Sequence, residues 1–479
     1  MPLHIYNSLA KRKEPFVPLQ PDRVGLYVCG PTVYAPPHIG NARSAVVFDL
    51  VCRILRAQYK QVVYVRNITD VDDKIIAVAK QQQTSIHQIA DQITKKYTKV
   101  YQNNLAALGC LVPDHQPRVT EHIPGIIQII TRLLNAGHAY VVDGHVLFDV
   151  PGFKDYGRLS HRSYQDMLAG ARVEVGDYKK HPADFVLWKP SSEDLSGWDS
   201  PWGRGRPGWH IECTAMAEQY LGNTIDIHGG GQDLIFPHHE NEIAQGMCAH
   251  EGQAYCRYWM HNGFVRINQH KMSKSLGNIL LVNDLLEQAS GEAIRLALLT
   301  THYSQPLEWS DQTLVQANKT LESWYTRLAA LQYVDVDPTD IKPALDTAFL
   351  AALNDNINTP QALHLLHQWF KTLGKLNQSA TQPKGTVYKE QRQIKARILG
   401  AAQLLGILQQ EPESWLNQQK DYKSQQVDLT EQDISALLAE RKQARKQRDF
   451  TKADAIRKQL ADQGIMIDDT PEGTKWHYK

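Results

Sequence analysis

The chain lacks the features that mark membrane-spanning and disulfide-rich proteins. No run of about 18 apolar residues occurs in its 479 residues, and Met1 to His4 do not begin a signal peptide. Only six cysteines are present, at irregular spacing, which argues against a disulfide framework and favours a reducing, cytoplasmic environment. Excess charge is missing too, because 52 Lys and Arg residues stand against 51 Asp and Glu residues. Any nucleic-acid partner must therefore bind local basic patches rather than a globally basic surface.

Shifts in composition divide a chain that is too long for one hydrophobic core. Residues 1–116 and 207–303 alternate short apolar runs with helical periodicity, so each is expected to form half of one α/β domain. Residues 117–206, between them, are irregular and rich in glycine, proline and aromatic residues. This stretch is expected to be an insertion into that domain.

Beyond residue 303 the sequence turns helical. Residues 304–410 contain an apolar stripe at helical spacing, formed by Leu314, Leu321, Trp324, Tyr325, Leu328 and Leu331. Breaks at 377–384 and 409–426 are typical of linkers. The second break separates the expected helical bundle from a small C-terminal module at 427–479.

The first chemical motif follows a short apolar strand. Residues 24–28 favour a strand, a turn signal follows at 29–32, and residues 42–57 repeat apolar side chains at helical spacing. The motif His38-Ile39-Gly40-Asn41 lies between the turn and the helix, where a glycine permits close approach of a ligand. A second strand is expected at 61–65. Strand, glycine-containing loop and helix is the arrangement by which doubly wound parallel sheets bind nucleotides.

The second motif, Lys271-Met272-Ser273-Lys274-Ser275, lies far downstream. Lysines on a loop neutralise charge that develops on a triphosphate as pyrophosphate leaves. Each motif alone is a weak signal, because unrelated lysine loops and structural turns are common. Together they resemble the two nucleotide-binding signatures of class I aminoacyl-tRNA synthetases. The resemblance implies catalytic roles for His38, Lys271 and Lys274, and ATP binding by Thr32, His38, Gly40, Asn41 and Lys274.

Four residues are candidate metal ligands: Cys29, Cys213, His238 and Glu242. His238 and Glu242 are four residues apart, so on a helix both side chains leave the same face, and the adjacent His239 and Glu240 point away. No C-x-x-C spacing joins the four, and buried cysteines with a helix-capping histidine would have the same sequence. Spacing alone leaves the two interpretations open.

Two further clusters invite a site assignment that their spacing does not support. Asp70, Asp72 and Asp73 lack the spacing and terminal glutamate of an EF-hand loop. The triplet Gly229 to Gly231 has no following Lys-Ser or Lys-Thr, as a P-loop would. We expect a backbone turn there that allows close approach to an amino acid or adenosine.

Longer stretches resemble one family in particular, the cysteinyl-tRNA synthetases. They are residues 29–34, 67–74 (Asn-Ile-Thr-Asp-Val-Asp-Asp-Lys), 208–213 (Gly-Trp-His-Ile-Glu-Cys) and 226–234, continuing to 242. The resemblance implies one Zn²⁺ per chain on Cys29, Cys213, His238 and Glu242, and an amino-acid pocket with Trp209, Thr69 and His228. It also implies a Rossmann-like parallel sheet with a connective insertion, then a helical bundle and a small module that bind the tRNA anticodon end.

The implied reaction activates L-cysteine with ATP and Mg²⁺ and transfers it to tRNA(Cys), by a chain expected to act as a monomer. Zinc suits this substrate, because a thiolate binds the metal far better than an alcohol does, whereas shape alone separates cysteine from serine by only about 1–3 kcal/mol. No editing domain is then needed. A purely structural zinc is the alternative, since four protein ligands usually make a closed site.

Basic residues crowd the helical segment at about 434–463 and include Arg441, Lys442, Arg445, Lys446, Arg448, Lys452, Arg457 and Lys458. Charge alone fits a solvated helix face equally well. The resemblance favours contact with RNA backbone. Trp476 and Tyr478 offer surfaces on which bases stack, or they pack against the module.

Two other functions compete with tRNA charging. A cysteine ligase acting on an amino sugar shares the zinc and nucleotide sites but lacks the C-terminal anticodon part. A non-catalytic RNA-binding protein derived from a synthetase would not need the lysine motif. Asn41 stands where many relatives have a second histidine, and because asparagine still donates a hydrogen bond we expect activity to be retained.

Overall fold

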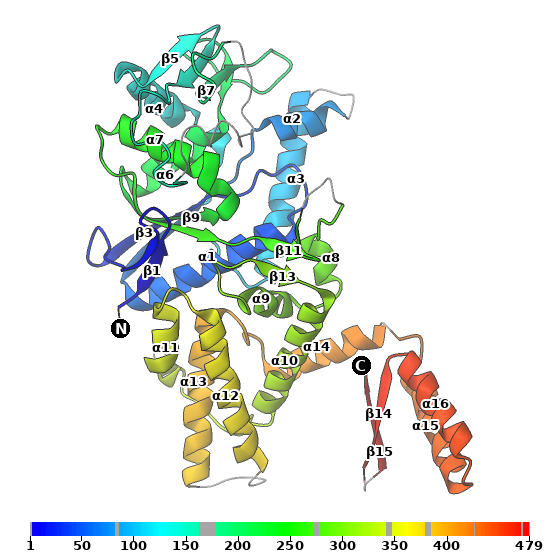
Figure 1. The fold of residues 1–479 in the computed structure, drawn as a ribbon. Helices are drawn as coiled ribbons and strands as arrows, with labels where there is room; N and C mark the ends of the chain where they lie inside the picture. The colour runs from blue at the N-terminus through cyan, green and yellow to red at the C-terminus, as the bar shows by residue number, and fades with distance from the viewer. Residues whose placement is uncertain are drawn as a thin grey trace. The chain divides into compact units, whose positions relative to one another are not determined.

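The computed structural model describes residues 2–81, 86–161, 178–272, 277–341, 347–378, 385–425, 427–470 and 473–478. Two compact units make up the chain (Figure 1): Met1–Lys319 with Val336–Ile407, and Thr320–Asp335 with Leu408–Lys479. Among the described residues, none of the helices combines the length and the apolar character needed to cross a membrane.

The first unit is built on a four-stranded parallel sheet in the order β10-β9-β3-β4. Its strands are β3 (Arg23–Val28), β4 (Gln61–Arg66), β9 (Ile225–Gly231) and β10 (Cys256–Asn262). Helix α1 (Ile39–Gln58) connects β3 to β4 in one direction, and α7 (Glu240–Ala249) lies between β9 and β10 in the other. The connection therefore reverses between β3 and β9, which is the switch point where such sheets bind ligands. The predicted doubly wound α/β fold is confirmed.

Helices cover both faces of this sheet (Figure 1), with α1 on one face and α6 (Trp209–Leu221) on the other. The apolar stripe predicted for 42–57 is buried, but α1 begins three residues earlier. His38 caps the helix: its Nδ1 accepts from the backbone N–H groups of Gly40 and Asn41, and the Asn41 side chain accepts from the His38 N–H. This reciprocal capping box satisfies amides that would otherwise lack partners.

The stretch between the two halves of the sheet is more regular than its composition suggests. After α2 (Asp73–Lys80) and α3 (Ile86–Ala107) come α4 (Ile123–Asn135) and an antiparallel sheet in the order β5-β6-β7-β8. Its strands are β5 (Ala139–Val142), β6 (His145–Phe148), β7 (Phe185–Pro190) and β8 (Gly205–Pro207). Strands of three to six residues are too short for their alternation to stand out in sequence.

A second small sheet carries the start of the lysine motif. Its strands are β11 (Val265–Ile267), β12 (His270–Lys271) and β13 (Leu307–Trp309). Asn268 and Gln269 turn β11 into β12 with φ values of 52° and 66°, the left-handed conformation that tight hairpins require. The remaining elements at this end are α8 (Val282–Leu286) and α9 (Gly291–Leu299), while β1 (His4–Asn7) and β2 (Arg12–Pro15) form an N-terminal hairpin.

The C-terminal half is helical, as expected. Its helices are α10 (Asp311–Ala329), α11 (Thr347–Asn354), α12 (Thr359–Gln378), α13 (Thr386–Leu405) and α14 (Pro412–Gln425). The linker expected at 409–426 is wrong, because α14 occupies it. This helix is mostly polar, but Trp415 is fully buried and stacks on Tyr325 of the same unit at 4.3 Å. Of the other expected break, residues 379–384 lie outside the described part of the chain.

The basic segment expected at 434–463 consists of two helices, α15 (Glu431–Lys446) and α16 (Phe450–Asp462). Arg448 has a φ of 61° and Asp449 caps α16, which ends the first helix and starts the second. A hairpin of β14 (Ile465–Thr470) and β15 (Gly473–Tyr478) packs with them around a small apolar core: Ile434, Ile456, Leu460, Ile465 and Ile467.

Candidate active site

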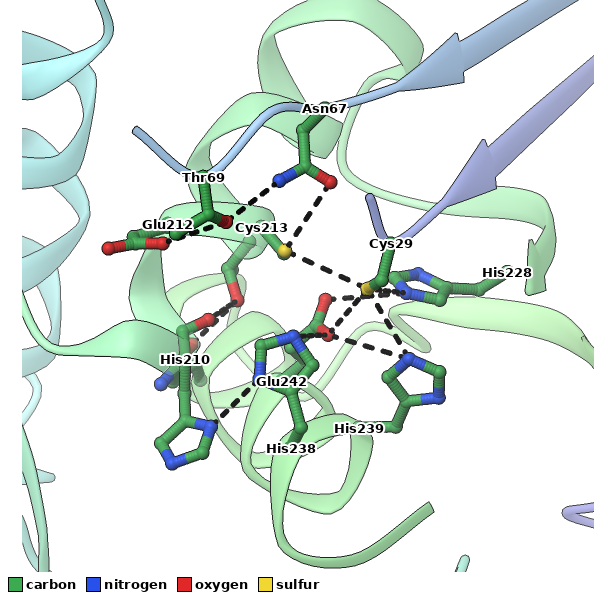
Figure 2. Close-up of polar contacts among 12 residues, drawn as sticks. Cys29, Asn67, Thr69, His210, Glu212, Cys213, His228, His238, His239 and Glu242 are labelled. Carbon is green, nitrogen blue, oxygen red and sulfur yellow. Dashed lines mark hydrogen bonds and ion pairs between the residues drawn. The ribbon is translucent and has the colours of Figure 1, made fainter. Parts of the chain in front are cut away.

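Polar side chains from four elements converge at the switch point between β3 and β9 (Figure 2). Cys29 follows β3, Cys213 lies in the second turn of α6, and His238 and Glu242 follow β9. One potential ligand atom from each of these four residues lies within 4.8 Å of all the others. The structure thus brings together the four residues that the sequence nominated as metal ligands.

The spacing of these atoms suits a tetrahedral metal ion. The two sulfur atoms, Cys29 Sγ and Cys213 Sγ, are 3.7 Å apart, and two thiolates on one tetrahedral zinc would be about 3.8 Å apart. Cys29 Sγ lies 3.5 Å from Glu242 Oε1, and His238 Nε2 lies 3.1 Å from the same oxygen. The sulfur separation is far longer than a disulfide bond.

Burial makes the charged state of this cluster expensive without a cation. Burial, followed by the neighbouring Cys213, raises the pKa of the Cys29 thiol and of the Glu242 carboxyl well above their usual values. Burial, followed by His210, holds the pKa of His238 well below its usual value. A divalent cation would offset this cost for the Cys29 thiol and the Glu242 carboxyl, because it binds their anionic forms, and it also binds a neutral imidazole.

His239 also reaches this cluster, so the expectation that it points away is wrong. Its Nε2 lies 3.3 Å from Cys29 Sγ, and the buried His228 Nε2 lies 3.4 Å from the same sulfur on another side. The expectation assumed a regular helix. Residues 235–239 instead form a wide π-type turn that includes extended backbone at Phe236, and α7 begins only at Glu240. His228 and His239 make a second group with Cys29 and Glu242 that has metal-binding spacing.

Aromatic and polar side chains hold the histidines in place. Trp209 stacks on His238 with ring centroids 4.3 Å apart, and Trp259 stacks on His228 at 4.5 Å. His239 Nδ1 lies 2.8 Å from His261 Nε2. Trp259 and His261 belong to no sequence motif, so nothing in the sequence indicated their place beside the cluster.

The three residues expected in the amino-acid pocket surround the cluster. His228 touches it directly. Trp209 remains 38% exposed at its edge, while the buried Thr69 accepts a hydrogen bond from Asn67 and lies 3.5 Å from the Glu212 carboxylate. Asn67 Oδ1 lies 3.9 Å from Cys213 Sγ and links Thr69 to the cluster.

A cavity of about 340 Å³ adjoins the cluster. Cys29, Gly30 and Pro31 line one part of it, and His38 and Asn41 line another. Cys29 therefore belongs both to the metal-binding cluster and to the wall of the cavity that holds the first motif. Thr32, expected to bind ATP, is absent from the described residues that line this cavity, and its backbone instead bridges to Thr69.

The backbone brings the first motif and the lysine motif together. Met272, which precedes the undescribed residues 273–276, lines the cavity, and a Cβ on Gly40 would lie 3.3 Å from its methyl carbon. After those residues, Leu281 forms an antiparallel bridge with His38, and the Ile39 N–H donates to the Leu280 carbonyl. Lys274 lies outside the described residues, and so does the side chain of Lys271.

The glycine triplet is not the turn that we expected. Gly229 to Gly231 end strand β9, and their small size serves close packing within the sheet layer. A Cβ on Gly229 would lie 2.2 Å from the ring of Phe48, and one on Gly230 would lie 2.8 Å from the ring of His239. Bare backbone at these positions lets α1 and His239 approach the end of β9.

The acidic cluster after β4 has structural partners, in line with the rejection of an EF-hand. Asp70 accepts from Thr120, and Asp72 caps α2 through the Lys74 N–H. Asp73 forms ion pairs with Lys189 and Arg206.

Comparison with known proteins gives matches along nearly the whole chain. Residues 15–319 match the family described as the class I (C) tRNA synthetase catalytic domain, and residues 428–476 match the cysteinyl-tRNA ligase anticodon binding domain. A protein of Parvibaculum lavamentivorans named cysteine–tRNA ligase is 53% identical over 474 residues, 99% of this chain and 97% of its own length. One of the same name from Rhodospirillum rubrum is 50% identical over 99% of both chains.

The fold has solved neighbours as well. A Mycobacterium tuberculosis methionyl-tRNA synthetase in complex with methionyl-adenylate matches with a TM-score of 0.59 at 17% identity, covering 83% of this chain and 93% of that one. At this level of identity the likeness concerns the fold alone.

Proposed function

Because the chain belongs to the cysteine–tRNA ligase family of class I aminoacyl-tRNA synthetases, we propose the following mechanism for it. It activates L-cysteine with ATP to cysteinyl-adenylate and pyrophosphate, then transfers cysteine to the 3′-terminal adenosine of tRNA(Cys). The proposal rests mainly on the position of Cys29, which belongs both to the metal-binding cluster and to the wall of the cavity that His38 also lines.

The side chains of Cys29, Cys213, His238 and Glu242 would hold one Zn²⁺. Their mixture of two sulfurs, one imidazole and one carboxylate is a donor set that zinc accepts readily. When bound, Zn²⁺ supplies a soft Lewis acid that prefers a thiolate to an alcohol and lowers the pKa of the substrate thiol. The buried walls formed by His228 and Trp259 would exclude water and restrict the pocket to a short side chain.

The nucleotide would lie in the cavity at the N-terminus of α1. His38 uses Nδ1 as an acceptor for two backbone amides, so its neutral ring carries the proton on Nε2, which can donate to a phosphate oxygen. Gly40 keeps the helix start free of a Cβ next to Met272. Lys271 and Lys274 would neutralise the departing pyrophosphate, and Mg²⁺ would accompany ATP without an assigned ligand on this chain.

These side chains act mainly by position and charge. The substrate carboxylate would attack the α-phosphorus in line with the departing pyrophosphate. The terminal ribose hydroxyl of tRNA would then lose its proton and attack the carbonyl of the mixed anhydride, and AMP would leave as the acyl–phosphate bond breaks. The Nε2 proton of His38 would stabilise the negative charge that builds on phosphate oxygens in the first step.

The second unit would bind the anticodon end of the tRNA. Arg441 and Arg445 pair with Asp469, and Lys452 pairs with Glu440, so these three cations stabilise the module itself. Other exposed basic residues lie on α15 (Lys442 and Lys446), on α16 (Arg457 and Lys458) and between the two helices (Arg448). Trp476 packs against the small apolar core, which supports a packing role for it. The side chain of Tyr478 is outside the described residues.

The test is cysteine-dependent exchange of pyrophosphate into ATP, followed by charging of tRNA(Cys), with zinc per chain measured by mass spectrometry. We expect about one zinc per chain, and discrimination against serine above the roughly 5- to 150-fold that shape alone provides. Cys213→Ala should lose zinc and cysteine activation together. Cys248→Ala, a buried cysteine outside the cluster, should retain both. Full activity in zinc-free protein would overturn the proposal.

A further inference from the structure

Arg66, the last residue of β4, differs from the other buried arginines of the first unit. Arg43 and Arg295 are fully buried and Arg66 is 3% exposed. A buried guanidinium needs hydrogen-bond acceptors for its five N–H groups and an anion or several dipoles for its charge. The three residues meet this need to very different degrees.

The guanidinium groups of Arg43 and Arg295 are well supplied with acceptors. Arg43 donates to the carbonyls of Phe264 and Gln305 at 2.6 Å each, and to three further carbonyls at 3.0–3.4 Å. Arg295 pairs with the buried carboxylate of Asp49 at 2.5 Å and donates to the Leu405 carbonyl at 2.7 Å. Both serve the packing of the unit.

Arg66 has far less. Its guanidinium carbon lies 5.7 Å from the ring centroid of Tyr64 and 5.6 Å from that of Tyr101, and one nitrogen donates to the Tyr64 hydroxyl at 3.2 Å. Its Nε has no hydrogen-bond partner, which is true of Arg43 Nε as well. Among the described residues, however, Arg66 donates to no carbonyl and forms no ion pair with a carboxylate. Aromatic faces offset only part of the cost of burying a cation.

The missing anion has a place to bind, because Arg66 lines the same cavity as His38 and Asn41. Among the described residues of the cavity wall, Arg66 is the only permanently charged cation and Asp233 the only carboxylate. Tyr101 lines the cavity as well, so the ring that stacks on Arg66 also faces the ligand space.

We infer that Arg66 binds a phosphate group in this cavity, either from ATP or from the 3′ end of the tRNA. Arginine matches phosphate oxygens with two parallel N–H bonds, and Tyr64 and Tyr101 hold its plane fixed between them. The inference rests on the proposed function and adds to it a phosphate-binding residue outside both nucleotide-binding motifs.

The experiment compares full-length wild type with Arg66→Met and Arg66→Lys. Binding of ATP and of adenosine is measured by calorimetry in the presence of Mg²⁺, and the KM for tRNA is measured in charging. Arg66→Met should weaken ATP binding about ten- to hundredfold, because it removes charge-assisted hydrogen bonds to the phosphate. Its affinity for adenosine, which has no phosphate, should stay within twofold of wild type. Arg66→Lys should recover only part of the loss in ATP binding and stay at least threefold weaker than wild type, because lysine keeps the charge but cannot make the two parallel N–H bonds. Arg56→Met, which removes a charge from an exposed pair with Asp114 outside the cavity, controls for net charge.

The outcomes separate the two sources of phosphate. If ATP binding is unchanged in Arg66→Met and the KM for tRNA rises at least tenfold, the phosphate comes from the tRNA. Folded Arg66→Met that matches wild type in both measurements overturns the inference. Should Arg66→Met not fold, Arg66→Lys decides: at least threefold weaker ATP binding with adenosine unchanged supports the inference, and equal effects on both ligands overturn it. Wild-type protein without cysteine-dependent exchange would instead refute the proposed function.

Discussion

Replacing His210 by alanine is expected to weaken zinc binding, although His210 is not among the four proposed ligands. Its Nδ1 lies 3.0 Å from Nδ1 of His238, whose Nε2 faces Glu242 Oε1 at 3.1 Å. If Nε2 of His238 binds the metal, its Nδ1 carries the proton and donates to His210. This hydrogen bond fixes both the tautomer and the ring plane of His238. Removing such a partner typically costs 10- to 100-fold in metal affinity, about 1.4–2.7 kcal/mol, which agrees with the cost of leaving one buried donor unpaired.

The assay is competition for zinc between the full-length protein and a chromophoric chelator at fixed pH. His122→Ala is the matched control, because His122 is also buried and hydrogen-bonds to the Arg118 carbonyl and the Tyr220 hydroxyl without contacting the cluster. His210→Ala should bind zinc 10- to 100-fold more weakly, and His122→Ala should bind it as wild type does. Zinc affinity within twofold of wild type in His210→Ala would refute the assigned role of the hydrogen bond. An equal loss in both variants would point to general destabilisation.

Other expected outcomes follow from packing and capping. Arg295→Met leaves the buried Asp49 with Arg53 as its one remaining ion-pair partner among the described residues. The variant should lower the free energy of unfolding in urea by about 3–5 kcal/mol. A loss below about 1 kcal/mol would show that the Arg295–Asp49 pair does not stabilise the fold. Gly229→Ala should lower the free energy of unfolding by about 1–3 kcal/mol in the same assay, because the added Cβ would lie 2.2 Å from the buried ring of Phe48. Asn41→His should change the rate of adenylate formation less than tenfold, since Asn41 already caps the helix through the His38 N–H. A larger gain in pre-steady-state measurements would mark Asn41 as a defect.

The strand–helix–strand unit around the first motif was predictable because local patterns determine it. Residues 24–28 and 61–65 lie within β3 and β4, and the helix predicted at 42–57 is α1. The start of α1 was missed because it depends on a histidine as the capping residue, outside the usual set of Ser, Thr, Asp and Asn. Helix α14 was missed because its stability comes from one buried tryptophan rather than from an apolar stripe.

The sequence offered the four proposed metal ligands as candidates, but only family resemblance joined them into one site. Cys29 and Cys213 come together because β3 and α6 pack side by side, and no local spacing records that contact. His239 could not be placed correctly at all. Its direction depends on the π-type turn at 235–239, in which His238 meets Glu242 at i and i+4 and the next residue, His239, reaches Cys29 as well.

The proposed mechanism requires the metal-binding cluster to adjoin the cavity, because its substrate, cysteine, is small. In cysteine only three bonds separate the sulfur from the carboxylate carbon, so once the sulfur is fixed the carboxylate lies within about 4 Å of it. In the proposed mechanism, side chains that recognise the sulfur must therefore stand at the edge of the cavity that would hold the nucleotide. The end of β3 satisfies this condition, because Cys29 lines the cavity while its backbone N–H donates to the Gly229 carbonyl of the neighbouring strand. The same cluster placed one strand further along the sheet would lie about 4.8 Å away, and a substrate held there could not bring its carboxylate to the α-phosphorus.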